Sequence, residues 1–352
     1  MIALLITVDY PPNKGGVSRY YEGLVEVSES RIGVAGVDLG EKPPAGNGIR
    51  SRIRQILWAK KIIKQVPKNI SILIGQPHLG LGSILARRQF SLFIHGGEWG
   101  NYPLGTTFVK AIFNQAKLLI VNSSATAEKY VPKKLKDRII ILIPGLSRSF
   151  FGEIDTKKTA TNLEEKSHIN ILSVARLSPR KGLIKLIQAV EMLISNGQRV
   201  MLNIVGNGSE YENLAREIKS FDLIQIITGL TDDELKEKYC EADLFALFPT
   251  EIRGGEAWEG FGIVFLEAGA AELPIITSNT GGIKESTSPL GSIYLHEKCT
   301  KNEIHDELTR LISDKNKMSI MGSANRDWAI NQTWINRKPI VDKILEEIQT
   351  KC

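Results

Sequence analysis

Short apolar runs alternate with amphipathic stretches along most of the chain, and this alternation restricts the fold more than any other feature. In the first half, runs rich in β-branched residues return roughly every 20 to 30 residues. They lie at 3–8, 70–75, 91–96, 118–123 and 139–144. Buried strands that alternate with helical segments are typical of βαβ units on a parallel sheet. The sequence therefore predicts the α/β class.

The same alternation occurs a second time after residues 152–168, a polar segment with almost no apolar side chains that is typical of a linker. Six more runs follow, at 169–175, 200–206, 223–227, 244–248, 274–278 and 292–295. We therefore expect two Rossmann-like domains, at 1–151 and 169–327. The remaining segment, 328–352, is expected to be helical, and whether it crosses back to the first domain is left open. Because open α/β sheets bind ligands at the carboxyl ends of their strands, the two sheets are expected to face an interdomain cleft.

Composition and charge exclude several classes of protein. With 42% hydrophobic and 24% charged residues, the chain has the composition of an ordinary globular protein. Residues 1–150 hold 21 Lys and Arg against 9 Asp and Glu, whereas the rest of the chain holds 24 against 30. A basic first half suits nucleic acid, anionic lipid or an anionic ligand. No zinc-finger, RNP or basic-zipper pattern is present, so we expect no nucleic-acid partner.

The cysteines and the N-terminal run bear on localisation. Cys240, Cys299 and Cys352 match neither a disulfide framework nor a metal-binding spacing, which fits a reducing cytosol. The first apolar run ends at Asp9 without a basic segment before it, so we interpret it as a buried strand and not as a signal peptide. No run reaches the roughly 18 apolar residues of a membrane-spanning helix. We expect a cytoplasmic protein.

The strongest local pattern is EGFGIVFLE, which runs from Glu259 to Glu267. A helix is expected to begin near Gly262, so that the amides of Gly262, Ile263 and Val264 can hold an anion such as a diphosphate. The two carboxylates are suited to accept hydrogen bonds from sugar and ribose hydroxyls. The alternative is a capped helix start with solvated glutamates.

A second pattern, VARLSPRKG, directly follows the first strand of the second domain. Arg176 and Lys181 are placed there to neutralise charge that develops on a leaving diphosphate. The alternative is a basic turn in which Pro179 starts a helix and Lys181 is solvated.

Three glycine or histidine signals are weaker. Gly15 and Gly16 resemble a phosphate loop without its full motif, and the alternative for this pair is a plain tight turn. Gly206 belongs to half a dinucleotide fingerprint that more readily forms a strand-to-helix turn. His95 ends a strand and is either a substrate contact or a structural histidine. The pair Asp232 and Asp233 suggests a metal ligand set, but Thr231 with Glu234 forms a capping box, and no metal is assigned.

Residues 50–66 interleave basic and apolar side chains. As a helix, the segment is either a membrane-surface helix that contacts anionic lipid or a surface helix whose apolar stripe packs inward. Both interpretations stay open.

Taken in order, the GGVSRY loop, the HGG histidine, RLSPRKG, VGNGSE, LTDDELKEKYCEADLFALFPT and EGFGIVFLE resemble the retaining glycosyltransferases of family four. The resemblance covers most of the chain. It implies a GT-B fold, a nucleoside-diphosphate hexose as donor, linked to UDP or GDP, and retention at the anomeric carbon. It also implies that no metal or other cofactor is needed, and an acceptor that is a sugar or a lipid-linked sugar in cell-surface glycan or glycolipid assembly.

The resemblance also implies roles for individual residues. Arg176 and Lys181 would hold the diphosphate, with Gly16, Ile263 and Val264 completing its seat. Glu259 would bind the transferred sugar and Glu267 the ribose. His95 would lie near the reacting carbon, and Gly229 with Leu230 would line the base pocket.

One departure from the family pattern is the longer loop TEIRGGEAW, where Arg253, Glu256 or Trp258 are expected to reach donor or acceptor. Two other functions remain open at this point. One is a nucleotide-sugar epimerase of the same fold, and the other is an inactive nucleotide-sugar-binding scaffold.

Overall fold

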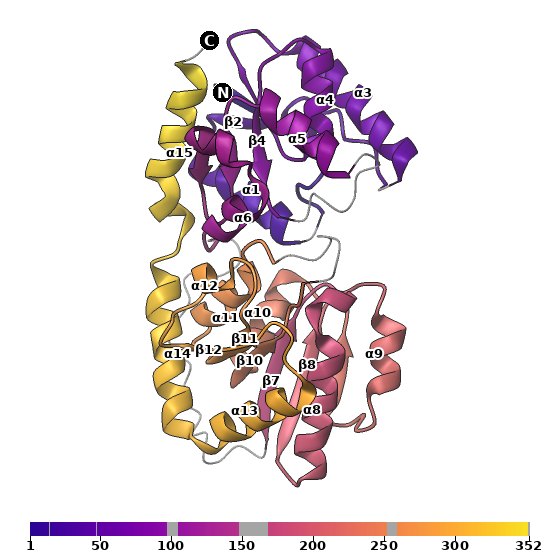
Figure 1. Cartoon of the computed structure of the whole chain (residues 1–352), viewed down its shortest axis with the longest axis vertical. Coiled ribbons are helices and arrows are strands. Elements are labelled where there is room, and N and C mark those ends of the chain that lie inside the picture. The colour runs from indigo at the N-terminus through magenta and orange to yellow at the C-terminus, as the bar shows by residue number, and fades with distance from the viewer. Residues whose placement is uncertain (14, 47, 97–104, 148–167, 252–258, 351–352) are drawn as a thin grey trace. The chain divides into compact units, whose positions relative to one another are not determined.

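The computed structural model describes residues 1–13, 15–46, 48–96, 105–147, 168–251 and 259–350. The chain divides into two compact units, Met1–Gly145 with Thr333–Cys352, and Leu146–Arg253 with Ala257–Gln332. In the described part of the chain each unit contains one parallel six-stranded sheet covered by helices (Figure 1). The prediction of two α/β sheets is confirmed.

The first unit has the strand order β2-β1-β3-β4-β5-β6. Its strands are β1 (Ala3–Ile6), β2 (Ile32–Val34), β3 (Ser71–Ile74), β4 (Ser91–Ile94), β5 (Leu119–Val121) and β6 (Ile139–Ile141). Its helices are α1 (Gly16–Val27), α2 (Ala35–Asp38), α3 (Ile49–Gln65), α4 (Pro77–Leu85), α5 (Gly105–Gln115), α6 (Ser124–Tyr130), the 3-10 helix η1 (Lys133–Arg138) and α15 (Trp334–Gln349). Because β2 lies on one side of β1 and β3 on the other, the direction in which strands are added to the sheet reverses between β1 and β3.

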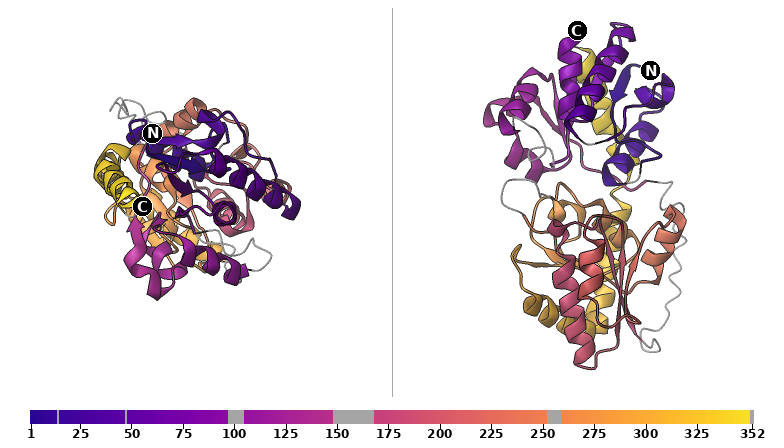
Figure 2. Two further views of the ribbon diagram at one scale, coloured as in Figure 1. Left: turned by 90° about the horizontal axis from the view of Figure 1, so that it is seen from above. Right: turned by 90° about the vertical axis from the view of Figure 1, so that its right-hand side faces the viewer.

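The C-terminal helix α15 is part of the first unit and packs against α1 (Figures 1 and 2). Its buried residues Trp334, Val341, Ile344, Leu345 and Ile348 join the same core cluster as residues of α1. Glycines in the first unit make room for the indole: a Cβ at position 23 would lie 1.9 Å from Trp334 Nε1. The helix therefore completes the hydrophobic core of this unit.

The second unit has the strand order β12-β11-β10-β7-β8-β9. Its strands are β7 (Ile169–Val174), β8 (Val200–Val205), β9 (Ile224–Ile227), β10 (Leu244–Leu247), β11 (Ile275–Ser278) and β12 (Ser292–Leu295). Its helices are the 3-10 helix η2 (Pro179–Lys181), α8 (Leu183–Ser195), α9 (Tyr211–Glu217), α10 (Asp232–Glu241), α11 (Ile263–Ala270), α12 (Ile283–Ser286), α13 (Lys301–Ser313) and α14 (Lys315–Ile330). Here the direction of winding reverses between β7 and β10.

Local signals explain where several helices start. The Thr231 hydroxyl accepts a hydrogen bond from the Glu234 amide, and the Glu234 carboxylate accepts one from the Thr231 amide, so the predicted capping box at the start of α10 is confirmed. Thr300 and Glu303 form the same reciprocal pair at the start of α13. These bonds satisfy amides that the first helical turn leaves unpaired.

The basic segment at residues 50–66 forms most of helix α3. Its two faces differ, and each has the character that one of the two interpretations requires. One face is buried and includes Trp58, Ile62 and Ile63, and this helix packs against α4. The other face exposes Ile49, Ile53 and Leu57. Within the part of the chain that the structure describes, no helix has the length and apolar character needed to cross a bilayer.

Candidate active site

The strand order of the second unit brings the two strongest sequence motifs together. The loop that follows β7 carries Arg176 and η2, and the segment that follows β10 leads through Glu259 to α11. Because β7 and β10 are paired neighbours, both segments leave the same edge of the sheet at the point where winding reverses. In open α/β sheets this switch point is where ligands bind.

A cluster of charges joins these two segments. The Lys181 ammonium lies 2.5 Å from a Glu259 carboxylate oxygen, and Arg180 lies 3.3 Å from the same oxygen. The side chains of Lys181 and Glu259 are only 7% and 11% exposed. Such a pair is held by charge-assisted hydrogen bonds in a medium that screens it weakly. The sequence predicted Lys181 and Glu259 as site residues but did not predict that they pair, and it missed Arg180.

The pKa values of the pair follow from burial and from its charges. Burial lowers the pKa of Lys181 below its ordinary value, although Glu259 acts against this effect. Burial alone would raise the pKa of Glu259, but Lys181 and then Arg180 outweigh it, and the pKa lies below its ordinary value. Glu259 is therefore a carboxylate at neutral pH, able to accept hydrogen bonds.

Helix α11 begins at Ile263, four residues after Glu259. Its N-cap Gly262 has φ of 86°, a left-handed conformation that favours glycine. The amides of Ile263 and Val264 head the first turn, where intrahelical partners are lacking and the helix dipole is positive. Glu267 lies one turn inside the helix, 2% exposed, and accepts a hydrogen bond of 2.9 Å from the Tyr239 hydroxyl. Tyr239 was not predicted as a site residue.

The loop after β11 fixes the backbone of Glu259. Gly282 donates its amide to the Glu259 carbonyl at 2.9 Å. Gly281 has φ of 59°, and a Cβ there would lie 1.9 Å from the same carbonyl oxygen. A glycine is required for this close approach, so the loop acts as a backbone clamp on the carboxylate.

The loops after β8 and β9 contribute glycines at the same edge. Gly206 lies between β8 and α9, and a Cβ there would lie 1.8 Å from the Ala175 carbonyl, so a glycine is required for this close approach to the loop after β7. Gly229, with φ of 76°, faces open space at its Cβ position, and Leu230 next to it is half-buried. Both lie between β9 and α10. Their predicted role as base-pocket residues is compatible with this exposed position.

In the first unit, too, polar residues and glycines lie at the carboxyl ends of the strands. Gln76, after β3, accepts a hydrogen bond from the amide of Val8 and donates one to Asp9, both after β1. Gly15 is the N-cap of α1 and Gly16 its first residue, and both are exposed. These residues lie at the switch point between β1 and β3. Gln76 was not predicted.

His95 follows β4 at this edge and is held by a short relay. The Tyr21 hydroxyl donates to the Gly75 carbonyl at 2.8 Å and lies 2.8 Å from His95 Nε2. Because the hydroxyl hydrogen is used on the carbonyl, Nε2 is the donor in this pair. Burial lowers the pKa of His95 to about 3, so the ring is neutral at physiological pH.

Arg176 is exposed, yet it is close enough to Lys181 to contribute to lowering the pKa of that ammonium. Arg253, Glu256 and Trp258 lie outside the described residues. Over the ranges that the structure describes, no group of three or more His, Cys, Asp or Glu side chains is arranged to hold a metal ion.

Comparison with known proteins identifies the family. The model of the family described as glycosyl transferases group 1 matches residues 154–328. A mannosyltransferase of Corynebacterium glutamicum, described as GDP-mannose-dependent monoacylated alpha-(1-6)-phosphatidylinositol monomannoside mannosyltransferase, is 32% identical over 92% of this chain and 92% of its own. The chain belongs to the glycosyl transferases group 1 family. This group 1 glycosyltransferase is also 26% identical to the GDP-mannose-dependent alpha-(1-6)-phosphatidylinositol monomannoside mannosyltransferase of Mycolicibacterium smegmatis, over 95% of each chain.

Solved structures show the same fold at lower identity. The sucrose-phosphate synthase of Thermosynechococcus elongatus superimposes with a TM-score of 0.76 at 17% identity, covering 98% of this chain and 97% of its own. The Anabaena protein HepE in complex with UDP-glucose gives a TM-score of 0.74 at 17% identity, covering 98% of both chains. The predicted GT-B fold class of this group 1 glycosyltransferase is confirmed.

Proposed function

We propose that this glycosyltransferase is a retaining, metal-independent hexosyltransferase that uses a GDP- or UDP-linked sugar. The observation that carries the proposal is the buried Lys181–Glu259 pair, with Arg180, at the switch point beside the start of α11. Cations, helix amides and a buried carboxylate are thereby close together at the carboxyl ends of the strands of one sheet. A nucleoside-diphosphate sugar has the complementary groups side by side: a diphosphate for the cations and helix amides, and sugar hydroxyls for the carboxylate.

In this mechanism the charge that develops on the leaving diphosphate is stabilised by Lys181, Arg176 and the amides of Ile263 and Val264. These groups supply the positive charge for which other enzymes use a metal ion. Glu259 accepts hydrogen bonds from hydroxyls of the transferred sugar, and Glu267, oriented by Tyr239, accepts them from the ribose.

The proposal of retention rests on what the site can and cannot supply. Glu259 is engaged by two cations and is therefore a weak nucleophile. His95 is neutral, with a pKa of about 3, so it can exchange hydrogen bonds with substrate but is too weak a base to take the acceptor proton near pH 7. We therefore propose that the leaving phosphate takes the acceptor proton and that attack occurs on the face from which it departs.

The first donor to test is GDP-mannose, because the two relatives named above are described as GDP-mannose-dependent. A thermal-shift screen over GDP- and UDP-sugars would identify the donor, since a ligand at 100 times its Kd stabilises the protein by about 2.7 kcal/mol. Product analysis with and without acceptor then separates transfer from epimerisation. No shift with any nucleotide sugar would refute the proposal.

The residue assignment is tested by turnover. Lys181→Ala is expected to lower kcat by about two orders of magnitude, the usual loss for one well-placed electrostatic stabiliser. The control is Lys238→Ala, which removes an exposed ammonium paired with Glu241 on α10 of the same unit. Equal turnover in the two variants would contradict the assignment.

We further propose that the acceptor is lipid-linked and that the enzyme contacts the inner face of the cell membrane from the cytoplasm. The support is the outer face of α3, where Ile49, Ile53 and Leu57 are 62%, 51% and 54% exposed. Four exposed cations share this face: Arg50, Arg54, Lys61 and Lys64. The cytoplasmic leaflet is anionic, and each such cation contributes about 1 kcal/mol near its surface.

Co-sedimentation with vesicles tests this contact. Binding is expected for vesicles rich in anionic lipid, much less for neutral ones, and is expected to be lost in Ile53→Ser/Leu57→Ser. The matched control is Ile320→Ser on α14, where the side chain is 61% exposed. Sedimentation that is the same for anionic and neutral vesicles would refute the membrane contact without touching the sugar-transfer assignment.

A further inference from the structure

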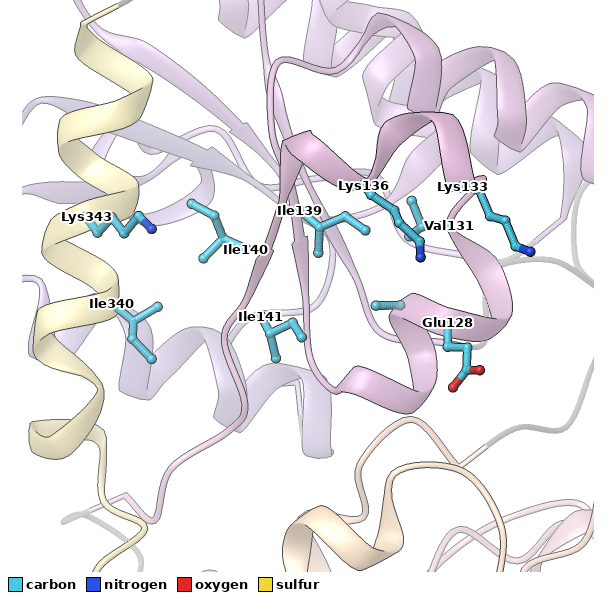
Figure 3. Close-up of a pocket in the computed structure, with 10 residues that line it drawn as sticks. Glu128, Val131, Lys133, Lys136, Ile139, Ile140, Ile141, Ile340 and Lys343 are labelled. Carbon is cyan, nitrogen blue, oxygen red and sulfur yellow. The ribbon is translucent and has the colours of Figure 1, made fainter.

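The free edge of the first unit's sheet carries a groove that the sugar-transfer site does not use. Strand β6 is the last in its sheet, and within the described ranges no strand pairs with its outer side. The groove has a volume of about 850 Å³ and lies between α6 with η1 on one side and α15 on the other (Figure 3). Its lining residues are Ala127, Glu128, Val131, Lys133, Lys136, Ile139, Ile140, Ile141, Ile340 and Lys343.

The floor of the groove is the strand itself. Consecutive side chains of a strand point to opposite faces, so Ile139 and Ile141 lie on the side of α6 and η1, and Ile140 lies on the side of Ile340 (Figure 3). Ile141 is 37% exposed. An extended segment laid along β6 would therefore find an apolar surface for its side chains on both faces.

The backbone of β6 is oriented for pairing. The amide of Leu142 donates to the Val121 carbonyl of β5 at 2.9 Å. In a parallel ladder, alternate residues direct their N–H and C=O groups to the same neighbour. Ile140 therefore faces β5 as Leu142 does, and Ile141 directs its amide and carbonyl to the open edge.

The walls of the groove are basic. Lys133 and Lys136 are exposed on one wall and Lys343 on the other, with Glu128 as the one carboxylate among the lining residues. The segment 124–138, which forms the first wall, contains five Lys and Arg against two Asp and Glu. A ligand with negative charge on both flanks is favoured.

We propose that this groove accepts an extended acidic segment of a partner protein, which adds to β6 as a further strand. An acyl chain would fill the apolar floor but leave the Ile141 amide and carbonyl covered and unpaired, which is costly. A second copy of this chain that paired through β6 would bring two sets of three lysines together, which is unfavourable. An acidic strand satisfies the backbone, the isoleucines and the lysines at once.

Fluorescence anisotropy with labelled peptides tests the proposal on the full chain. The probe is a short peptide in which Glu and Val alternate. Its controls are the same peptide with a central Pro, which lacks one amide, and a peptide in which Lys replaces Glu. We expect saturable binding of the first peptide, weakening with salt, and binding at least about tenfold weaker for both controls.

Two variants locate the binding. Ile141→Pro removes the amide at the open edge, where proline is tolerated in a strand, and is expected to abolish binding of the Glu–Val peptide. Lys133→Glu/Lys136→Glu/Lys343→Glu is expected to weaken it at least about tenfold. The matched control reverses three exposed lysines elsewhere on the unit: Lys42, Lys68 and Lys110. Thermal melting checks that each variant is folded, and the lysine variants carry the test if Ile141→Pro is not.

Several outcomes would overturn the proposal. Equal binding of the Glu–Val and central-Pro peptides would show charge attraction without strand pairing. Absence of binding would leave the lysines as a device that keeps the edge from aggregating. Dimerisation of the full chain that Ile141→Pro removes, or anionic vesicle binding that it removes, would identify a different occupant. Sugar transfer is expected to be unchanged in all of these variants, so failure here is distinct from failure of the proposed function.

Discussion

The interaction between Lys181 and Glu259 can be measured with a double-mutant cycle of Lys181→Met, Glu259→Gln and the double variant. The two charges are 2.5 Å apart and their side chains are 7% and 11% exposed, so removing one charge leaves the other buried. Loss of one partner of such a pair typically costs 3 to 5 kcal/mol. Because Arg180 lies 3.3 Å from Glu259 and still compensates it, we expect a smaller cost for Lys181→Met, about 2 kcal/mol.

The double variant buries neither charge, so it should be more stable than the two single losses predict. The expected coupling free energy is about 1 to 3 kcal/mol. The assay is equilibrium urea unfolding at pH 7, followed by circular dichroism. The same cycle on Lys238 and Glu241, an exposed pair at 2.8 Å on α10, provides the control, with an expected coupling of about 0.5 kcal/mol or less.

The result that refutes this reasoning is additivity. If the Lys181 and Glu259 effects add to within about 0.5 kcal/mol, the two charges do not interact in the folded protein. A stability loss in Lys181→Met would also need to be separated from its loss of turnover, and measuring activity well below the unfolding transition does this.

Two further predictions concern backbone and burial. Gly281→Ala should lower both stability and turnover, because its Cβ would lie 1.9 Å from the Glu259 carbonyl oxygen. The control is Gly197→Ala, which is also at positive φ but has open space around its Cβ. It should lower stability only by the roughly 1 to 2 kcal/mol of left-handed strain and leave turnover unchanged. His78 has a pKa of about 4, lowered by burial and then by Arg52, so the unfolded chain takes up its proton first and stability falls as pH drops below about 6.5. Between pH 7 and pH 5 this histidine should lower the free energy of unfolding by about 2 kcal/mol. The measurement is the unfolding free energy of the parent minus that of His78→Gln, determined at both pH values. If this difference is the same at pH 7 and pH 5, His78 is not buried as a neutral group.

The sequence was sufficient to predict most of the strands, because apolar β-branched runs between helices have few other interpretations. It was not sufficient for β2, a strand of three residues at the edge of its sheet, where IGV is too short to show a pattern. Helix α14 was also missed. It buries Gly322 and Asn325 next to methionines, and Asn325 is buried because it bonds the carbonyls of Leu273 and Gly291, which periodicity does not reveal.

At the candidate site, motif spacing led to the prediction of Lys181, Glu259 and Glu267, but it could not predict their contacts, which depend on strand order. That Lys181 lies against Glu259 follows only once β7 is known to pair with β10. The same limit applies to Tyr21 and His95, whose contact spans α1 and the end of β4. Contacts between loops from different strands are set by the sheet topology, which local sequence does not specify.

The position of α15 has a consequence for synthesis. Residues of α1 such as Tyr20 and Leu24 belong to a core that is closed by Trp334 and Leu345, which are translated more than 300 residues later. While the ribosome synthesises the intervening unit, the apolar surface of the first unit that α15 will cover stays exposed. Truncation before Thr333 should therefore lower the stability of the first unit, which is synthesised first.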